Sequence, residues 1–316
     1  MPTLTVPAGS PRQRLDLFLV AALASEALTR SRVQRLIDGG AVMVNGAAEP
    51  TRFKVRAGDV VELTLPKAVA PTLKPAKIKL DILYEDKDLL VVNKQAGLVT
   101  HPGAGHHDDT LANALLYHCG KSLKPIQGSL RPGIVHRLDK DTTGCLVAAK
   151  TEAAFIALQA MIAAREVTRL YLALVWGDLI EDSGSIDANL GRGNDRKKIV
   201  LKPSGGKRAV THFKVRARFG LATELECKLE TGRTHQIRAH LHSIGHSVVG
   251  DHTYGRLPGH LPADLLAALP KVLQRQALHA WKLQFKHPIS GKAIKVEAPE
   301  PADLVAARKL LKAHAL

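Results

Sequence analysis

Apolar residues near the start of the chain recur at helical spacing. Leu15, Leu19 and Leu23 lie four residues apart, which predicts an amphipathic helix over residues 12–24. Two arginines and a short apolar run there also resemble a secretion signal. The run is only eight residues long and begins at an aspartate, so a helix of a folded module is favoured. A second short helix is predicted over residues 30–38, because a Thr or a Ser can cap its start and a Gly-Gly pair follows it.

Strand patterns complete a small N-terminal module. The apolar run at residues 41–44 is followed by Asn45-Gly46, which is a strong signal for a tight hairpin turn. A closing strand is predicted over residues 60–65, after a Gly-Asp turn pair. Two short helices and a few strands in this length of chain predict an α+β domain over residues 12–66.

The composition changes after this module. Residues 66–79 hold three prolines, four lysines and no acidic residue, which predicts an extended linker over residues 67–79. Residues 80–316 mix strands and helices without strict alternation, so an α+β domain is favoured over a doubly wound sheet. The predicted strands are residues 89–93, 144–149, 171–176 and 221–229, and the predicted helices are residues 153–164, 234–244 with Thr234 as its cap, 261–278 with a break at Pro270, and 303–315.

The protein is strongly basic. Its 316 residues include 45 Lys or Arg and 29 Asp or Glu, a formal net charge of +16, which points to a polyanionic partner. Aromatic residues make up 4% of the chain, too few for a binding surface built mainly on aromatic stacking. Three widely spaced cysteines and the lack of an apolar run long enough to span a bilayer predict a reduced, cytoplasmic protein with no membrane partner.

One segment concentrates much of this charge. Residues 191–208 hold seven basic residues and one acidic residue. A flexible loop that grips nucleic-acid phosphates is the favoured interpretation, and a solvated surface hairpin is the alternative. The candidate nucleic-acid contacts are Arg192, Arg196, Lys197 and Lys198 in this segment, and Arg30, Arg32 and Arg35 on the helix predicted over residues 30–38.

The densest polar cluster is residues 136–144, which read His-Arg-Leu-Asp-Lys-Asp-Thr-Thr-Gly and come directly before a predicted strand. Polar side chains where a loop meets a rigid strand suit a functional site. Asp139 and Asp141 can act as the paired carboxylates of a glycoside hydrolase, although their spacing in a loop does not fix the distance between them. Asp139 can equally be a turn-forming residue.

A second polar cluster spans residues 231–240, which read Thr-Gly-Arg-Thr-His-Gln-Ile-Arg-Ala-His. Arg233 and Arg238 can bind phosphates or a carboxylate. The histidines in and after this segment suggest a metal site, but no cysteine or carboxylate lies at ligand spacing beside them, so no metal is expected. The chain has no Walker-type phosphate loop and no Gly-x-Gly-x-x-Gly after a strand, so no nucleotide cofactor is expected.

Five motifs, in order, resemble the RluA family of RNA pseudouridine synthases. They begin at residues 99, 136, 171, 231 and 275 and read Val-Thr-His-Pro-Gly-Ala-Gly-His, His-Arg-Leu-Asp with a following Thr-Gly, Tyr-Leu-Ala-Leu-Val, Thr-Gly-Arg-Thr-His-Gln-Ile-Arg, and Arg-Gln-Ala-Leu-His-Ala with a later His-Pro-Ile-Ser-Gly. Residues 12–66 resemble the alpha-L RNA-binding domain, which places the chain nearest the RluD branch. The resemblance implies a catalytic domain over residues 80–316, with a central, mostly antiparallel mixed sheet flanked by helices and loops.

The resemblance also implies an activity, the conversion of specific uridines in large-subunit ribosomal RNA to pseudouridine. Uracil leaves its ribose, rotates and reattaches through C5. Asp139 is implied as nucleophile or base toward the sugar, Arg238 as its charge partner, and Tyr171 as the residue that stacks on the base and takes the C5 proton. Arg137 is implied to fill the space of the flipped uridine. The other implied RNA contacts are Arg233, His235 and the basic residues named above.

Two alternatives to an RNA isomerase are open at this point. One is a non-catalytic RNA-binding or ribosome-assembly factor on the same fold. The other is a glycoside hydrolase that uses Asp139 and Asp141, which explains the basic charge poorly because neutral sugars need no such field. A DNA-binding protein is disfavoured because no helix-turn-helix or zinc-finger motif appears. Gln95 stands where the family usually has proline, which we expect to alter a loop and not the chemistry. The expected partner is ribosomal RNA or its assembling subunit, and a monomer without cofactor or metal is expected.

Overall fold

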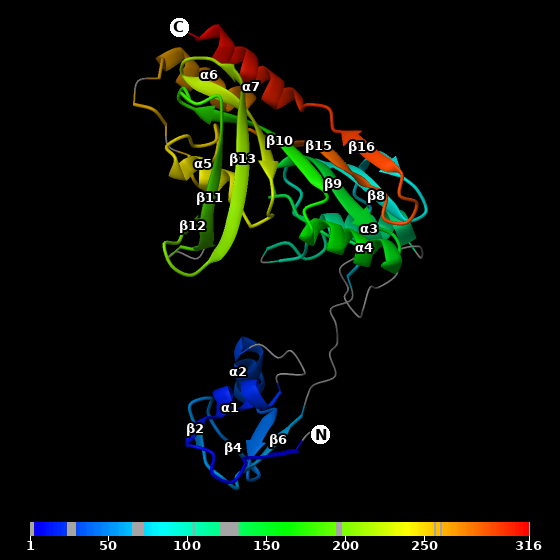
Figure 1. The fold of residues 1–316 in the computed structure, drawn as a ribbon, viewed down its shortest axis with the longest axis vertical. Coiled ribbons are helices and arrows are strands. Elements are labelled where there is room, and N and C mark those ends of the chain that lie inside the picture. The colour runs from blue at the N-terminus through cyan, green and yellow to red at the C-terminus, as the bar shows by residue number, and fades with distance from the viewer. Residues whose placement is uncertain are drawn as a thin grey trace. The chain divides into compact units, whose positions relative to one another are not determined.

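The computed structural model divides into two compact units, residues 1–72 and residues 73–316. In Figure 1 the first unit is drawn in blue and the second runs from cyan to red. The hydrophobic core of the first unit is formed by residues between Val6 and Leu63, and separate clusters form the core of the second. The structure describes residues 3–23, 30–64, 73–103, 105–120, 133–193, 198–255, 257–259 and 261–315.

The first unit combines two helices with short strands. Its elements are β1 (Thr3–Thr5), β2 (Gln13–Arg14), α1 (Leu15–Ala22), α2 (Arg30–Asp38), β3 (Val42–Val44), β4 (Ala47–Ala48), β5 (Lys54–Val55) and β6 (Val60–Leu63). Four strands form a sheet in the order β1-β6-β3-β4, and β2 pairs with β5. The tight turn predicted at Asn45-Gly46 is confirmed, because both residues have positive φ and join the antiparallel strands β3 and β4.

The two helices predicted for this unit are confirmed, with one boundary moved. Leu15 and Leu19 are fully buried on α1, and Val33 and Ile37 are buried on α2, so the apolar spacing read from the sequence does face the core. Helix α1 begins at Leu15 and not at residue 12, because the residues before it form β2 and pair with β5.

The second unit is an α+β domain. Its elements are β7 (Asp81–Glu85), β8 (Leu89–Lys94), α3 (Leu111–Cys119), β9 (Thr143–Ala149), α4 (Glu152–Ala163), β10 (Thr168–Trp176), β11 (Ser183–Arg192), β12 (Ile199–Leu201), β13 (Lys207–Arg218), β14 (Ala222–Leu229), α5 (Gln236–Ser243), α6 (Ala263–Val272), β15 (Leu278–Lys286), β16 (Ala293–Glu297) and α7 (Ala302–Ala313).

A single mixed sheet organises this unit. The strand order is β12-β11-β13-β14-β10-β15-β9-β8-β7, and β16 pairs with β15. The described strands of this sheet are antiparallel to their neighbours except for β15 and β9, which run parallel. This confirms the expected mostly antiparallel mixed sheet. The order also brings the start of β9 close to the middle of β10, because each is paired with β15 near His279.

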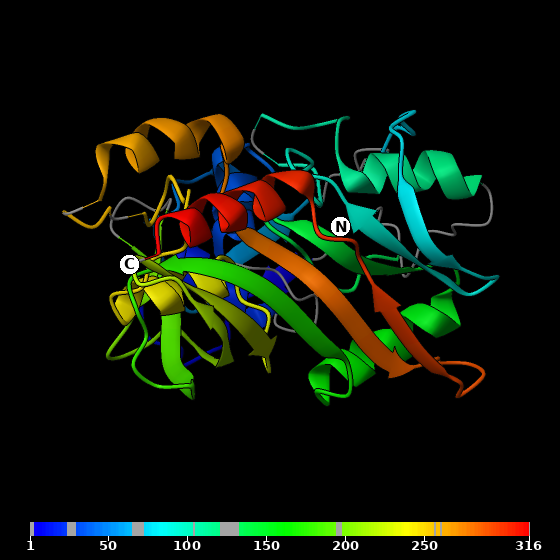
Figure 2. The same ribbon diagram turned by 90° about the horizontal axis from the view of Figure 1, so that it is seen from above.

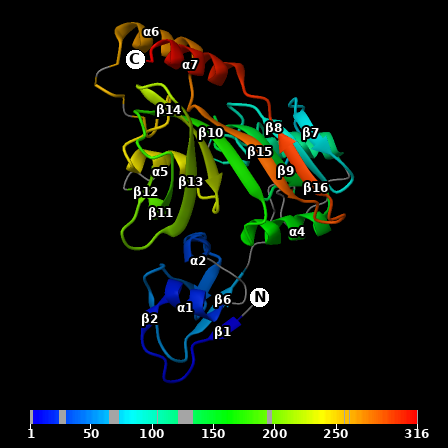
Figure 3. The same ribbon diagram turned by 45° about the horizontal axis from the view of Figure 1, so that its top comes forward.

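Helices cover the sheet of the second unit. Helices α6 and α7 lie side by side at one end of the unit (Figure 1 and Figure 3), and Figure 2 looks onto α7 where it lies across the sheet. Leu304, Ala307 and Leu311 bury the inner face of α7 in the main core. Helix α4 packs Ala154 and Leu158 against a second cluster that includes β9. Within the described residues, no helix combines the length and the apolar character needed to span a membrane.

The structure corrects the helix predicted over residues 261–278. Helix α6 ends at Val272, two residues after Pro270, and Leu278 is already the first residue of β15. The helix runs through Pro270, so the break predicted there is wrong, because the N–H that proline lacks would bond back to residue 266 and is not needed for the turn that follows. The chain beyond it extends, and the N–H of Ala277 bonds to the carbonyl of Val249.

The structure also corrects the favoured interpretation of the basic segment 191–208. Half of its described residues are strand, because residues 190–192 at the end of β11 pair with residues 199–201 of β12, and β13 begins at Lys207. The expectation of a flexible loop therefore does not hold for them, and the alternative, a surface hairpin, describes them better. Arg196 and Lys197 lie outside the described residues.

Candidate active site

A pocket in the second unit joins the two polar clusters that stand out in the sequence. Its walls come from the loop before β9, from β10, from the end of β14 and from the start of α5. The lining residues are His136, Arg137, Leu138, Asp139, Thr142, Arg169, Tyr171, Leu229, Leu278 and residues 232–238. Segments about a hundred residues apart in the chain therefore meet around one cavity.

A charged network at the wall of the pocket holds Asp139. Nη1 of Arg238 donates to Oδ2 of Asp139 at 2.9 Å. The same guanidinium donates through Nε and Nη2 to the two carboxylate oxygens of Asp251, at 2.6 and 2.9 Å. Asp139 keeps 14% of its side chain exposed, whereas Asp251 is fully buried. Among the described residues, Oδ1 of Asp139 has no hydrogen-bond donor, so one oxygen remains available to a substrate.

The network keeps Arg238 and Asp251 charged. Burial alone would raise the pKa of Asp251, but hydrogen bonds from Arg238 and from the N–H groups of Thr253 and Tyr254 lower it overall. Burial alone would lower the pKa of Arg238, but its hydrogen bonds with Asp251 and the charge of Asp139 raise it above the ordinary value. The guanidinium is therefore a permanent positive charge beside the Asp139 carboxylate.

The backbone of the Asp139 loop is held from behind by three buried donors. The Thr100 hydroxyl donates to the carbonyl of Leu138 at 2.9 Å, and Nζ of Lys94 donates to the carbonyl of Lys140 at 2.9 Å. Nη1 of Arg275 donates to the carbonyl of Asp141 at 3.0 Å. The carbonyls on both sides of Asp139 are therefore fixed, as precise placement of one carboxylate requires.

Tyr171 lies on β10 beside Asp139 and is 5% exposed. Burial raises the pKa of its hydroxyl to about 12, so the group carries its proton at neutral pH. Its ring stands in the wall of the pocket. His136, also in the wall, accepts a hydrogen bond from the N–H of Val147 at its Nε2, and burial together with the charge of Arg169 lowers its pKa to about 3. It is thus a neutral side chain that joins the loop to β9.

The predicted cap of helix α5 is wrong. The residue before the helix is His235, in the left-handed conformation with φ of 53°, and Thr234 does not cap it. Gln236 holds the turn instead, because its Oε1 accepts from the Thr231 hydroxyl and from the N–H of Arg233. The ring of His235 lies 3.0 Å from the hydroxyl of Tyr254, which also accepts from the N–H of Ile199. This hydroxyl therefore joins the start of α5 to residues 191–208, the basic hairpin.

The expected RNA contacts are placed unevenly. Arg137 and Arg233 are exposed at the pocket, and a neighbouring cleft adds Arg192 and Lys207 beside Arg233. Lys198 is exposed at the start of β12. Arg196, Lys197 and the side chains of Arg30, Arg32 and Arg35 lie outside the described part of the chain.

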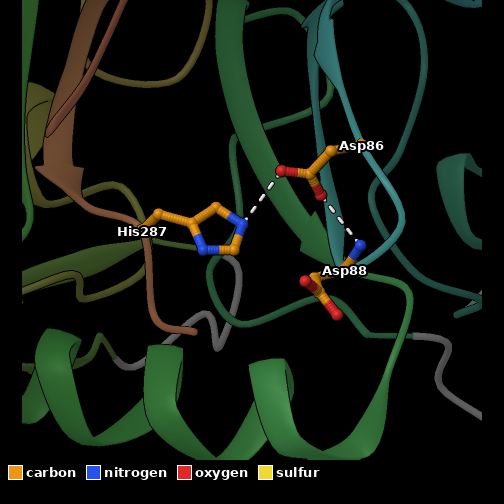
Figure 4. Close-up of side chains that lie close together, drawn as sticks. All are labelled: Asp86, Asp88 and His287. Atoms are coloured by element: carbon orange, nitrogen blue, oxygen red, sulfur yellow. Dashed lines mark hydrogen bonds and ion pairs between the residues drawn. The ribbon is translucent and has the colours of Figure 1, made fainter. Parts of the chain in front are cut away.

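One group of side chains has the donor types of a metal site. Ligand atoms of Asp86, Asp88 and His287 lie within 4.8 Å of one another, and Figure 4 shows them between two turns of the second unit. Most of these donors already have partners. Asp86 accepts from the N–H groups of Asp88 and Leu89, and its Oδ2 lies 2.9 Å from Nε2 of His287. Nδ1 of His287 accepts two backbone N–H groups. The cluster therefore ties two turns together, and we assign it no metal.

Each of the histidines near α5 has a hydrogen-bond partner at Nδ1, although Nε2 of His240 is buried without one among the described residues. His240 bonds the Thr211 hydroxyl, His242 bonds the Ser247 hydroxyl, and His246 bonds the carbonyl of Trp176. Each ring is turned toward a different partner, which is the usual state of structural histidines.

Several residues of the site were missed by the sequence reasoning. Asp251 and Tyr254 lie in a loop whose sequence resembles an ordinary turn. Asp251 does act as a turn residue, since it accepts the N–H groups of Thr253 and Tyr254. Lys94 and Arg275 lie in motifs that stand out only by their resemblance to the family. Arg169 was overlooked, and only its position two residues before Tyr171 could have drawn attention to it.

Comparisons with known proteins agree on one family. A family model described as RNA pseudouridylate synthase matches residues 88–243, and one described as S4 domain matches residues 13–61. Ribosomal large subunit pseudouridine synthase D of Zymomonas mobilis is 45% identical over 302 residues, which cover 94% of this chain and 93% of that one. The protein of the same name from Pseudomonas aeruginosa is 43% identical over 303 residues, which cover 95% and 92%.

Solved structures show the same fold in the second unit. Human RNA pseudouridylate synthase domain containing 4 superposes with a TM-score of 0.57 at 27% identity, over 73% of this chain and 93% of that one. Human RNA pseudouridylate synthase domain containing 1 gives a TM-score of 0.55 at 28% identity, over 73% and 89%.

Proposed function

The chain belongs to the RNA pseudouridylate synthase family and is an isomerase of that class, and we propose that its substrate is large-subunit ribosomal RNA. Two relatives that match it over more than nine-tenths of both chains carry that substrate in their names. The net charge of +16 supports a polyanionic substrate. Ribosomal RNA is either free or part of an assembling subunit when it is modified, and the enzyme acts on it in the cytoplasm as a monomer.

Asp139 carries the chemistry at the sugar. Its carboxylate accepts a hydrogen bond from Arg238 at Oδ2 and leaves Oδ1 without a donor among the described residues. This oxygen either attacks C1′ of the target ribose or removes its 2′ proton. In both routes the bond between C1′ and N1 breaks, and the base is free to turn and to reattach through C5. The ion pair between Asp139 and Arg238 inside the pocket is the observation that carries this assignment.

Tyr171 serves the base. Its buried ring is a platform on which uracil can stack, and its hydroxyl is the group assigned to take the C5 proton after reattachment. Because the pKa of this hydroxyl is raised to about 12, the neutral phenol is a weak acceptor. Proton removal by Tyr171 therefore requires that the hydroxyl pass its own proton onward.

Base flipping brings the uridine into the pocket. Arg137 lies beside Asp139 and is exposed, so its planar guanidinium can stack in the gap that the flipped base leaves. Arg233, His235 and the basic hairpin hold the flanking RNA, and the N-terminal unit, which matches the S4 domain, adds Arg30, Arg32 and Arg35. The isomerisation is redox-neutral and uses no second substrate, so no cofactor and no metal is assigned.

Carbodiimide mapping of pseudouridines in ribosomal RNA tests this function. RNA from cells that lack the gene is expected to lose specific pseudouridines in the large-subunit RNA and to regain them when the wild-type gene is restored. An identical map with and without the gene overturns the proposed substrate.

A further inference from the structure

Arg169 is a buried cation in the pocket that has no carboxylate partner. It is 4% exposed, and among the described residues no carboxylate oxygen lies within 4.0 Å of its guanidinium. Its Nη2 makes one long hydrogen bond, 3.5 Å, to the carbonyl of Glu230, and its Nε is buried without a partner. The carboxylate of Glu230 is itself taken by Arg165 and His212.

Such a residue is costly to the fold. A guanidinium stays charged at any physiological pH, and burying a charge without a counterion opposes folding. The neighbouring Arg238 shows the opposite arrangement, since all three of its donor nitrogens are used by Asp139 and Asp251. An under-paired cation of this kind in a pocket is a candidate for binding a negative charge that only the reaction brings.

Arg169 lies in the part of the pocket where the uracil base would stack on Tyr171. It lies two residues before Tyr171 on β10, so the two side chains project from the same face of the strand, and both line the pocket. Its Nη1 packs beside Gly232, where a Cβ would approach to 2.9 Å. Glycine at this position leaves that edge of the guanidinium uncovered, and Nη1 has no hydrogen-bond partner among the described residues.

The reaction creates a negative charge at this position. When the bond between C1′ and N1 breaks, its electron pair stays with the base, and uracil becomes an anion with charge spread over N1, O2 and O4. The charge disappears again when C5 bonds to C1′; the C5 proton then leaves and N1 gains a proton, so the product base is neutral. Resting on the proposed function, we propose that Arg169 is the catalytic residue that stabilises the detached uracil anion, a role for which Arg238 is less suited because each of its three nitrogens already donates to Asp139 or Asp251.

A phosphate of the RNA is the competing ligand for this guanidinium. Arg233, which is exposed at the same pocket, is better placed for phosphates because the backbone passes outside the pocket. Arg169 is recessed beside the tyrosine platform. The two ligands predict different measurements, since a phosphate contact acts on affinity and its salt dependence, whereas a contact to the detached base acts on the chemical step.

Single-turnover kinetics separate these cases. We expect Arg169→Gln to slow tritium release from RNA labelled at C5 of uridine by on the order of 100-fold, with the Kd for RNA and its salt dependence unchanged. Arg169→Lys is expected to keep part of the rate because it keeps the charge. Gly232→Ala is expected to give a smaller loss, since the new methyl group displaces Nη1. Arg216→Gln, which removes an arginine from over the ring of Trp281, is the matched control and is expected to change nothing.

Thermal unfolding excludes a merely structural role. Removal of a buried, under-paired charge is expected to leave the Tm of Arg169→Gln unchanged or raised while activity falls. An unchanged rate, a higher Kd with a salt slope lowered by about one, or a lowered Tm overturns the assignment. If the wild-type enzyme itself releases no tritium, the proposed function fails, and that outcome is distinct from failure of Arg169.

Discussion

Asp251 accepts two hydrogen bonds from Arg238, through Nε and Nη2, and this leaves Nη1 alone to face Asp139 at 2.9 Å. The buried carboxylate therefore fixes the plane of the guanidinium, and the guanidinium fixes the exposed carboxylate. Burial decreases along this series of contacts, because Asp251 is fully buried and Asp139 is partly exposed. Asp251 is a positioning residue that acts on the substrate only through Arg238.

The first prediction concerns Asp251→Asn. The substitution removes a charge that Arg238 needs and weakens its two-pronged contact, so we expect a loss of about 2–4 kcal/mol in the free energy of unfolding. We also expect a lower rate at saturating RNA with little change in KM. Denaturant unfolding and single-turnover kinetics measure the two effects. Asp108→Asn is the control, because Asp108 is exposed and its one ion pair among the described residues is with Lys74, at 3.9 Å.

The stability part of this prediction depends on pH. The pKa of Asp251 is lowered in the folded protein, so its contribution is fully present above the ordinary pKa of the unfolded chain and is lost as pH falls through the folded value. The difference between wild type and Asp251→Asn should therefore be largest at neutral pH and shrink in acid below about pH 4. A difference that does not change with pH contradicts the assignment of an ionised, paired carboxylate.

The second prediction concerns Tyr171→Phe. The variant keeps the ring that stacks on uracil and removes the hydroxyl that handles the C5 proton. We expect an RNA affinity within about twofold of wild type and a rate of tritium release lower by roughly 100-fold. Filter binding and single-turnover tritium release are the measurements. Tyr117→Phe, on the exposed face of α3, should behave as wild type. If Tyr171→Phe releases tritium at the wild-type rate, another group removes the C5 proton.

The third prediction concerns Gly144, where the Asp139 loop enters β9. It has φ of 111°, and a Cβ there would lie 2.2 Å from the carbonyl oxygen of Ala280 on the parallel strand β15. Gly144→Ala should therefore destabilise the second unit by about 3 kcal/mol. The two tryptophans lie in β10 and β15, so their fluorescence in denaturant follows this unit. Gly103→Ala, which has open space around it, should cost little; equal stability of the two variants contradicts the packing argument.

The fourth prediction concerns the N-terminal unit. Its core is made only of its own residues, so deletion of residues 1–66 should leave the second unit folded. We expect weaker binding to ribosomal RNA, or poorer choice among its uridines, while the circular dichroism and tryptophan fluorescence of the second unit persist. Carbodiimide mapping of the modified RNA measures selectivity. An unchanged modification pattern removes any role of this unit in substrate choice.

Local patterns predicted much of the fold. The apolar runs of β8 and β9 and the helical spacing on α1 were readable because a buried strand or helix face needs consecutive or periodic apolar residues. Helix α3 was missed although Thr110 and Asn113 form a capping box at its start, because Asn in the third helical position is a weaker signal than the usual Glu or Gln. The end of α6 was misplaced because pairing of β15 in the sheet overrides a continued helical pattern.

The site was only partly accessible to sequence reasoning. Asp139 and Arg238 belong to motifs dense in polar residues, so they stand out in the sequence alone. Asp251 and Arg169 carry no local signature, and their roles follow from contacts between segments far apart in the chain. The basic hairpin was misread because its charge suggested a loop, whereas residues 199–201 pair with β11.

The most direct test of the central claim is tritium release from ribosomal RNA labelled at C5 of uridine, measured for wild type and for Asp139→Asn, with RNA affinity measured in parallel. The two proteins differ by one carboxylate oxygen, and Arg238 keeps its contact with Asp251 in both. We predict release by wild type, no detectable release by Asp139→Asn, and similar affinity for RNA. Release by Asp139→Asn at the wild-type rate contradicts the account.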